Sequence, residues 1–458
     1  MTAAHSISAS IDSEELYFEE LRGREYARLD ADDHAYLDFT GSGLYAERQV
    51  TKHADRLRSS LFGNPHSENG PSLFTTAVIH RAKSRLLDFV DAPHDEYVVV
   101  FTANTSAAIK LVAESFPFTR DSALVLSADN HNSVNGIREF ARAAHSATSY
   151  VELNHELHLV DARGTLAQKR RSDHDLFAFP AQSNFSGVKH SLALIKQAQK
   201  LGYRVLLDAA AFLPTNRWSL REYPADFVAL SMYKVSGYPT GVGALIARKE
   251  SLAMLTRPWF AGGTVQYASV QNDRHMLLVR NGEGFEDGTP AFLDIAAVAD
   301  GLDLIDEIGI DRINRHVTTH AMTFLEGLTR LCSRSGARLV RVYGPRPGAT
   351  RGATIAFNVI GADGNTVPFG RVVERARNEG VSLRGGCFCN PGASERAFGF
   401  LAQRTASCLD ALGSGFSIDK FSECLGPDIP VGAVRASMGI ATNRRDVDRA
   451  LAVVASFG

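Results

Sequence analysis

The sequence predicts an α/β protein with a mostly parallel sheet, and two observations carry this prediction. Between residues 96 and 230, short and almost continuously apolar runs alternate with helical patterns, as is typical of parallel strands covered by helices on both faces. The chain also has 458 residues, of which 45% are hydrophobic and 22% charged. That length and composition suit an ordinary globular protein of about two or three domains.

The expected elements follow from the positions of these runs. Strands are expected at 96–101, 123–126, 176–179, 204–207, 226–230 and 243–247, with helices at 107–115, 134–144 and 191–201. Before them come a helix at 13–21, a short strand at 36–40, a helix at 46–62, a turn-rich loop at 63–71 and a helix at 75–90. After them, a helical tract runs from 292 to about 332, followed by strands at 354–358 and 381–383 and helices at 369–379 and 445–454. We therefore divide the chain into an N-terminal segment (1–45), a large domain (46–300) and a smaller α+β domain (301–458).

Charge and composition argue against several classes of partner. The net charge is -2 without a basic block, so binding to nucleic acid or to an anionic membrane has no electrostatic support. No apolar run approaches the ~20 residues that span a bilayer, and the N-terminus has no secretory pattern, so a cytoplasmic protein is expected. An odd, sparse set of cysteines indicates free thiols in a reducing compartment; these are Cys332, Cys387, Cys389, Cys408 and Cys424. Cys387 and Cys389 have one spacer and no second ligand pair, so no metal site is expected.

Lys234 lies just past the apolar run 226–230, and α/β folds keep their chemistry at the carboxyl ends of strands. Its primary amine can hold an aldehyde cofactor as a Schiff base. Ser231 ends the same strand. For a single lysine, a surface side chain leaving a strand is the simpler interpretation, so the assignment depends on what the neighbouring strands carry.

Two further strand ends offer partners for pyridoxal phosphate. Thr105 and Ser106 follow the strand at 96–101 and open a helix, whose unpaired N–H groups and positive dipole end suit a phosphate. A plain helix N-cap is the alternative. Asp208 follows the strand at 204–207, where a carboxylate can keep the pyridine nitrogen protonated and the ring electron-withdrawing. An aspartate that only starts a turn is the alternative.

Two more strands end in polar side chains of the right kind. His131 follows the strand at 123–126, where an imidazole can stack on the cofactor or move protons; a locally bonded loop histidine is the alternative. Asn184 follows the strand at 176–179, and its amide can contact the phenolate oxygen of the cofactor. The coincidence of several strands, each ending in a group that a pyridoxal phosphate site uses, is stronger than any one motif.

A glycine-flanked cysteine segment, from Leu383 to Ala393, is expected to form an exposed, mobile loop. Arg384 can bind a substrate carboxylate in its bidentate fork. An exposed cysteine near positive charge ionises and acts as a nucleophile. A pair of small buried hydrophobic residues is the alternative, and the loop composition argues against it.

Several longer strings resemble one family. They are Asn132–Phe140, Phe179–Gly187, Tyr223–Val228, Gly237–Ala244, Gly262–Val265, Phe285–Thr289 and Gly386–Ala393. Through them the chain resembles the aminotransferase-like domain of molybdenum cofactor sulfurases. More broadly, it resembles the class V, cysteine-desulfurase-like branch of fold-type I pyridoxal phosphate enzymes. The resemblance runs from about Tyr36 to Phe457, and the cysteine string is its most specific part.

The resemblance implies a fold-type I transferase with pyridoxal 5'-phosphate as cofactor. Lys234 corresponds to the Schiff-base lysine, Asp208 to the partner of the ring nitrogen, and His131 to the histidine stacked on the ring. The implied phosphate ligands are Thr105, Ser106 and Ser231. Thr289 corresponds to a threonine that reaches the phosphate of a neighbouring subunit, which implies a homodimer.

The resemblance also implies a reaction on L-cysteine. Cys389, rather than Cys387, corresponds to the cysteine that receives the sulfur as a persulfide, while alanine is released. The sulfur then passes to an acceptor protein or cofactor. The implied substrate contacts are Arg384 and Asn184, with His66 of the loop 63–71 as a further candidate.

Two positions depart from the desulfurase pattern, and two other functions stay open. Tyr233 stands where a histidine usually precedes the lysine, and Ala211 stands where a glutamine is usual. The first alternative is a class V lyase, epimerase or aminotransferase that acts on another small amino acid, with Cys389 incidental. The second is a non-catalytic partner protein or sulfur carrier with the same fold. Whether Cys387 assists Cys389 is also open.

Overall fold

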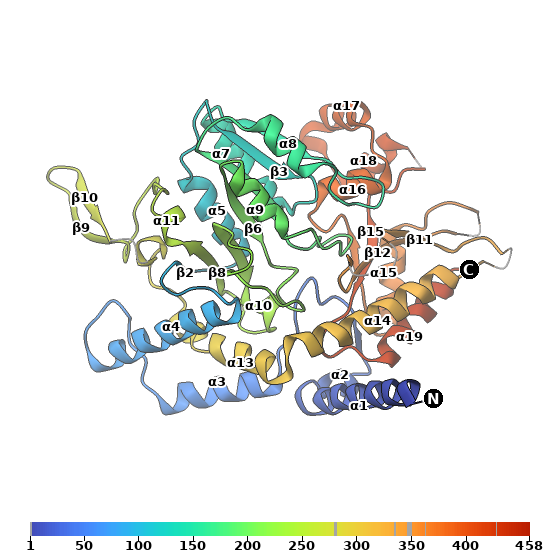
Figure 1. Cartoon of the computed structure of the whole chain (residues 1–458). Coiled ribbons are helices and arrows are strands. Elements are labelled where there is room, and N and C mark those ends of the chain that lie inside the picture. Colours follow the sequence, from blue (N-terminus) through green and yellow to red (C-terminus); the bar gives the residue numbers. More distant parts are fainter. Residues whose placement is uncertain (1, 279–281, 334–335, 346–349, 362, 427) are drawn as a thin grey trace.

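The computed structural model describes residues 2–278, 282–333, 336–345, 350–361, 363–426 and 428–458, and it has the expected α/β architecture. Figure 1 shows helices packed around a central sheet, the C-terminal part of the chain to one side, and a hairpin projecting at the other side. Among the described residues, no helix combines the length and the hydropathy needed to cross a bilayer.

The large sheet has seven strands in the order β2-β8-β7-β6-β5-β3-β4. Their bounds are β2 (Tyr97–Thr102), β3 (Ala123–Ser127), β4 (Ala147–Val151), β5 (Asp175–Pro180), β6 (Tyr203–Asp208), β7 (Phe227–Ser231) and β8 (Gly243–Arg248). The predicted mostly parallel sheet is confirmed, and β8 is the exception, since it runs antiparallel to both β7 and β2. A parallel return would need a long crossover, whereas only residues 232–242 join β7 to β8.

Helices cover both faces of this sheet, so strands such as β5 and β7 are buried at every residue. This burial explains why their sequences are continuously apolar rather than alternating. One face packs on α5 (Thr105–Ser115), α6 (Asn132–Asn135) and α7 (Ile137–Ala143). The other packs on α4 (Gly70–Phe89), α8 (Ala162–Lys169), α9 (Ala193–Lys200) and α13 (Val298–Ile308). Two single turns, α10 (Met232–Val235) and α11 (Lys249–Leu252), follow β7 and β8.

The N-terminal and linking segments differ in detail from the prediction. Helices α1 (Thr2–Glu25), α2 (Arg28–Ala31) and α3 (Glu47–Ser59) precede α4. The strand expected at 36–40 is only β1 (Ala35–Tyr36), which pairs with β13 (Val381–Ser382) near the other end of the chain. The expected tract from 292 is three helices, α12 (Phe292–Ile295), α13 and α14 (Ile310–Arg330). Gly309, with φ of +90°, separates the last two, because that conformation suits glycine and ends a helix.

A second, four-stranded sheet lies in the C-terminal part, in the order β11-β12-β15-β14. Its strands are β11 (Val340–Tyr343), β12 (Thr354–Val359), β15 (Ala433–Ser437) and β14 (Arg384–Gly386). The predicted helices there are α15 (Phe369–Asn378) and α19 (Arg444–Ala455). The sequence did not predict β4, β11, β14, β15, the projecting hairpin of β9 (Val265–Ser269) and β10 (Arg274–Leu277), or the helices α16 (Pro391–Phe398), α17 (Ala402–Leu412) and α18 (Ile418–Leu425). The division of the chain at residues 45 and 300 stays a prediction.

The prediction that all cysteines are free thiols is wrong for two of them. Cys408 of α17 and Cys424 of α18 form a disulfide, whereas Cys332, Cys387 and Cys389 are free. The two helices pack on each other and bring the two Cα atoms within 5.8 Å, a closeness that a spacing of 16 residues does not reveal. Cys408 belongs to a small core with Phe421 and Leu425, separate from the main one.

Reduction of this disulfide is expected to destabilise the α17–α18 pair by about 3 kcal/mol. The reason is that the bond limits the conformational entropy of the unfolded chain, and a loop of this length regains that entropy when the bond is broken. Hydrogen exchange of the amides in 400–426 should therefore speed up in dithiothreitol or in Cys408→Ser. Cys332→Ser, which removes an exposed free thiol, is the matched control and should leave these amides unchanged. Equal exchange with and without reductant would contradict the prediction.

Candidate active site

The carboxyl ends of β2, β3, β5, β6 and β7 meet at one edge of the sheet around a pocket of about 760 Å³. This edge of an α/β sheet is where such folds bind small molecules and cofactors. Among the side chains that line it are Thr105, Ser106, His131, Asn184, Asp208, Ser231 and Lys234. The structure thus brings together most of the side chains proposed from the sequence, and their chemical roles stay predictions.

The first turn of α5 forms a polar cradle at one end of this pocket. The N–H of Thr105 donates to Ser231 Oγ at 2.8 Å, and the hydroxyls of these two residues are 2.6 Å apart. The hydroxyls of Ser106 and Ser133 are also 2.6 Å apart. Hydroxyls and N–H groups at the positive end of a helix are the donors that an anion prefers, so the cradle suits a phosphate.

This cradle is pressed close to the sheet. A Cβ added to Gly243 of β8 would lie 2.4 Å from the backbone carbonyl carbon of Asn104. Asn104 caps α5, because its side chain accepts the N–H of Ala107 at 3.0 Å. Only glycine permits so close an approach of two backbones, so Gly243 sets how near the start of α5 lies to the neighbouring end of β7.

The amine of Lys234 and the imidazole of His131 are both biased toward their neutral forms. Burial lowers the pKa of Lys234; Asp208 opposes this effect, and the charges of Arg435 and Arg384 add to it. Burial also lowers the pKa of His131, again with Asp208 acting in the opposite direction. A neutral amine is the form that attacks an aldehyde, so the electrostatics of the pocket suit an imine-forming lysine.

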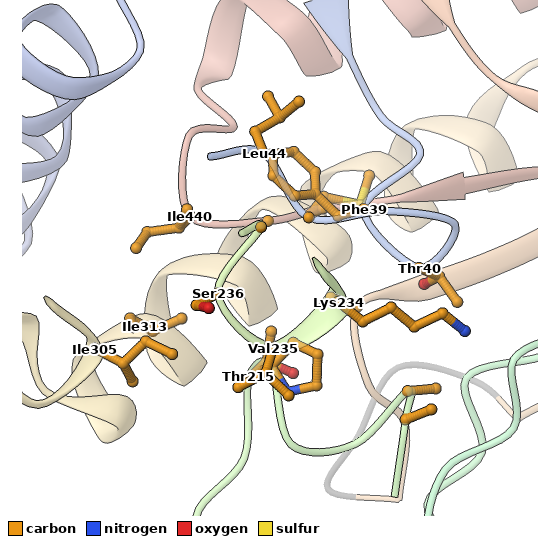
Figure 2. A pocket seen from close by; sticks show the side chains of 18 of the residues that line it. Phe39, Thr40, Leu44, Thr215, Lys234, Val235, Ser236, Ile305, Ile313 and Ile440 are labelled. Atoms are coloured by element: carbon orange, nitrogen blue, oxygen red, sulfur yellow. The ribbon is translucent and has the colours of Figure 1, made fainter. Parts of the chain in front are cut away.

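Lys234 also lines a second, mostly apolar cavity (Figure 2). Gln182, Ala210, Ala211 and Lys234 line both this cavity and the polar pocket, so they form the wall between them. Figure 2 shows the amine of Lys234 pointing away from Ile305 and Ile313. The amine therefore lies toward the polar pocket. Ala211, which departs from the desulfurase pattern, leaves this wall with a short side chain.

Two arginines face each other on adjacent strands, Arg384 of β14 and Arg435 of β15. Asp38 bridges them, with Oδ2 3.4 Å from Arg384 Nη1 and Oδ1 2.7 Å from Arg435 Nη2. Half of the Arg384 side chain is exposed, whereas Arg435 is buried and donates to the carbonyl of Asn184 at 2.9 Å. Sequence reasoning proposed Arg384 and missed Arg435. The signal for Arg435 was a charged residue inside the short, otherwise small and apolar run 433–437.

The cysteine segment is a short, well-anchored connection between β14 and α16. Cys389 is exposed and Cys387 is half-buried, but Phe388 between them is buried against Phe185. The Asn184 amide donates to the carbonyl of Phe388 at 2.7 Å, and the carbonyl of Cys389 accepts the N–H of Asn132 at the same distance. The exposure expected of Cys389 is found. A wholly exposed loop was a wrong expectation, because Phe388 contributes its ring to the core.

Four predicted residues are not among those that line the Lys234 pocket of this chain. Two of them, Arg384 and Cys389, lie in the segment described above, and the other two are Thr289 and His66. Thr289 lines another cavity, of about 920 Å³, with Ala107 and Lys110 of α5. His66 lines a further pocket, and its Nε2 lies 3.4 Å from the carbonyl of Gly288. The contact predicted for Thr289 is with a neighbouring subunit, so one chain does not test it. His66 is not brought near Lys234 within this chain, and its contact with the substrate stays a prediction.

Known proteins resemble this chain over most of its length. A family model described as aminotransferase class V matches residues 35–450. The chain is 35% identical over 466 residues to molybdenum cofactor sulfurase of Solanum lycopersicum, a match that covers 93% of this chain and 56% of that protein. The chain thus spans about half the length of the curated relatives it matches.

Solved structures share the fold at low sequence identity. The apo cysteine desulfurase of Thermococcus onnurineus NA1 has a TM-score of 0.78 at 24% identity, covering 96% of this chain and 97% of that one. A variant of the protein C-DES with glycine covalently linked to its PLP cofactor has a TM-score of 0.70 at 15% identity, covering 95% and 99%. These likenesses confirm the predicted fold class.

Proposed function

The chain belongs to the class V aminotransferase family, and from this premise we propose that it is a pyridoxal phosphate enzyme that takes sulfur from L-cysteine. Cys389 receives the sulfur as a persulfide, and the rest of the substrate leaves as alanine. The placement of Cys389 carries the proposal. Its carbonyl accepts the N–H of Asn132 at 2.7 Å, and Asn132 directly follows His131, which lines the Lys234 pocket. An exposed thiol is therefore attached to the rim of a pocket that contains a half-buried lysine.

The residues of the pocket fit this cofactor at four points. The cradle at the start of α5 offers Thr105 and Ser231 to a phosphate. Asp208, 9% exposed, offers a carboxylate to a protonated ring nitrogen, and His131 offers an imidazole to the ring face. Lys234 offers an amine whose lowered pKa favours bonding to an aldehyde. When bound, pyridoxal phosphate withdraws electrons from the Cα of an amino acid.

The side chains around the pocket divide the remaining work. Lys234 is the base for the Cα proton of the substrate, because its amine lines the pocket and burial favours its neutral form. Arg384 binds the substrate carboxylate, since half of its side chain is exposed and its fork is bidentate. Arg435 lies beside it and adds positive charge, which attracts the same carboxylate.

The sulfur-transfer step is balanced by the protein and the substrate alone. The Cys389 thiolate attacks the sulfur of the substrate, and an S–S bond forms as the Cβ–S bond breaks. The carbon that loses the sulfur takes up a proton in its place. L-cysteine and one protein thiol therefore yield alanine and one protein persulfide, without an external oxidant or reductant.

Three finer features belong to the same proposal. The sulfur passes from Cys389 to an acceptor protein or to the molybdenum cofactor, the group that the names of the curated relatives mention. Two chains form a homodimer, in which Thr289 of each chain reaches the pocket of the other. The enzyme works in the cytoplasm. The position of Thr289 in a cavity beside α5, away from its own Lys234, supports the dimer.

Turnover of L-cysteine by the full chain loaded with pyridoxal phosphate tests the proposal. With excess dithiothreitol, alanine and sulfide are expected in equal amounts. Lys234→Ala should lose the visible absorption band of the covalently held cofactor and form no alanine. Lys249→Ala, which removes an exposed lysine after β8, is the control and should retain both. Pyruvate in place of alanine, or turnover of another amino acid with cysteine left intact, would instead support a class V lyase, epimerase or aminotransferase.

A further inference from the structure

A buried polar network joins the cysteine segment to the sheet edge beneath the pocket. Asp129, just past β3, is fully buried, and so is Asn390, the residue directly after Cys389. Asn390 Nδ2 donates to Asp129 Oδ1 at 2.7 Å and to Asn184 Oδ1 at 3.0 Å. The Asn184 amide donates in turn to the carbonyl of Phe388 at 2.7 Å. Hydrogen bonds thus reach the residues on both sides of Cys389 from one buried carboxylate.

The residue at 129 needs a carboxylate to complete this network. Its Oδ1 accepts from Asn390 and also from Ser183 Oγ at 2.7 Å, while its Oδ2 lies 2.8 Å from His190 Nε2. Ser183 and His190 are buried too. A carboxylate has two oxygens that only accept, whereas an amide has one oxygen and an N–H₂ group that would face one of the donors. Hydrogen bonds to a buried charge are also stronger than neutral ones.

The network holds a backbone conformation that the cysteine segment does not favour by itself. Phe388 and Cys389 both have φ of +56°, in the left-handed region that side chains other than glycine rarely adopt. The first turn of α16 is also pressed against the strand end, because a Cβ at Gly392 would lie 2.2 Å from the carbonyl oxygen of Ala128. Two successive strained residues persist only where the surrounding contacts determine their position.

We propose that Asp129 and Asn390 are positioning residues that hold Cys389 at the rim of the Lys234 pocket. This inference rests on the proposed function, in which the thiol of Cys389 meets sulfur bound in that pocket. Neither residue lines the pocket, so both act through the backbone of the cysteine segment. When the hydrogen bond between them is broken, the segment relaxes from its left-handed conformation. The Cys389 thiol is then no longer held at the rim of the pocket, while cofactor binding is unaffected.

Exchange of the two side chains gives the sharpest test. In Asn390→Asp, two carboxylates face each other and repel, yet the residue can still cap α16, as Asn390 Oδ1 does by accepting the N–H of Ala393 at 3.2 Å. In the double variant Asp129→Asn with Asn390→Asp, an amide again faces a carboxylate, now with reversed polarity. The bonds from residue 390 to Asn184 and from Ser183 to residue 129 are not restored, so recovery is expected to be partial.

The measurement is the single-turnover rate of persulfide formation on Cys389, followed by mass spectrometry in the holoenzyme. We expect the rate to fall by a factor of about ten or more in Asn390→Asp and Asn390→Ala. In the double variant, we expect it to rise again by a factor of about three or more over that of Asn390→Asp. The visible cofactor band should stay unchanged in all of them. Hydrogen exchange should speed up for amides in 384–398 and not elsewhere. Asn443→Ala, which removes the equivalent cap of α19, is the matched control and should keep the wild-type rate.

Each outcome decides between positioning and a general loss of stability. Wild-type rates in Asn390→Asp and Asn390→Ala, or a double variant as slow as Asn390→Asp, would overturn the proposal. A slow rate in Asn443→Ala as well would also overturn it, since any loss of a cap would then suffice. If the wild type forms no persulfide, the proposed function fails, and hydrogen exchange alone decides the positioning role. Faster exchange confined to 384–398 and reversed in the double variant supports it, and unchanged exchange refutes it.

Discussion

Replacement of Cys389 by alanine is expected to lower alanine formation from L-cysteine by a factor on the order of 10³ or more, because the nucleophile that accepts the sulfur is removed. Cys387→Ala should stay within about threefold of the wild type. Cys389 is exposed at the rim, whereas Cys387 is half-buried and its carbonyl accepts the N–H of Asn390 at 3.0 Å. The two thiols are two residues apart, so the variants are closely matched.

Alanine release and the mass of the persulfide-bearing peptide, measured for both variants, check this prediction. The visible cofactor band and its change on adding L-cysteine should persist in both, because neither cysteine lines the Lys234 pocket. A large loss in both variants would mean that Cys387 assists Cys389 in the transfer. Full activity of Cys389→Ala would remove the persulfide step and leave a class V enzyme of another kind.

Acid is expected to destabilise the protein through two buried histidines. Between pH 6.5 and 4.5, their protonation in the unfolded chain should lower the free energy of unfolding by about 5 kcal/mol. His316 stacks on Phe18 of α1 with ring centroids 3.7 Å apart, and its Nε2 lies 2.9 Å from the carbonyl of Thr442. Burial lowers the pKa of His316 to about 3 and that of His320 to about 4. In both cases a nearby positive charge adds to the effect, from His320 and from Arg444 respectively.

The direction follows from which state takes up the protons. Below pH 6.5 the unfolded chain protonates both histidines, while the folded chain keeps them neutral until about pH 4 and pH 3. The contribution of these two groups to the free energy of unfolding is therefore fully present above pH 6.5. As the pH decreases below 6.5, this contribution is lost at about 1.4 kcal/mol per proton and pH unit. Urea unfolding at several pH values should show this loss.

His316→Gln with His320→Gln should flatten the pH dependence of stability, since neither side chain can then be protonated. The amide introduced by His316→Gln can still donate to the carbonyl of Thr442, which limits the cost of the change at neutral pH. His174→Gln, at an exposed histidine, is the control and should leave the pH dependence as it is in the wild type. An equally steep loss in the double variant would show that other groups govern acid unfolding.

The pocket was predictable because its residues follow a rule that one sequence can display. Asp208 and Lys234 each end a run of apolar residues, and parallel strands bring their carboxyl ends to a common edge. The strand pattern was visible for the same reason, since β5 and β7 are buried on both faces and hold no polar residue in the middle. The prediction needed only the order of residues along each strand.

The anchoring of the cysteine segment was not predictable in the same way. Asp129 and Asn390 are 261 residues apart, and each alone resembles an ordinary polar residue of a turn. Burial decides their importance, and burial of a polar residue depends on partners that a single sequence does not pair. Strand β15 was missed for a related reason. Arg435 interrupts its apolar run, and only the contacts with Asp38 and Asn184 make a buried arginine acceptable there.

The excursion of the chain through α17 and α18 has an evolutionary consequence. This segment begins after Phe398 and ends at Ala433. Its first end is held by helix α16, and its second end is held by the pairing of β15 with β12 and β14. Insertions between two fixed points cost little loop entropy. This stretch can therefore lengthen, shorten or be exchanged among descendants of the gene while the cysteine and the arginine on either side keep their places, and sequence divergence should concentrate there.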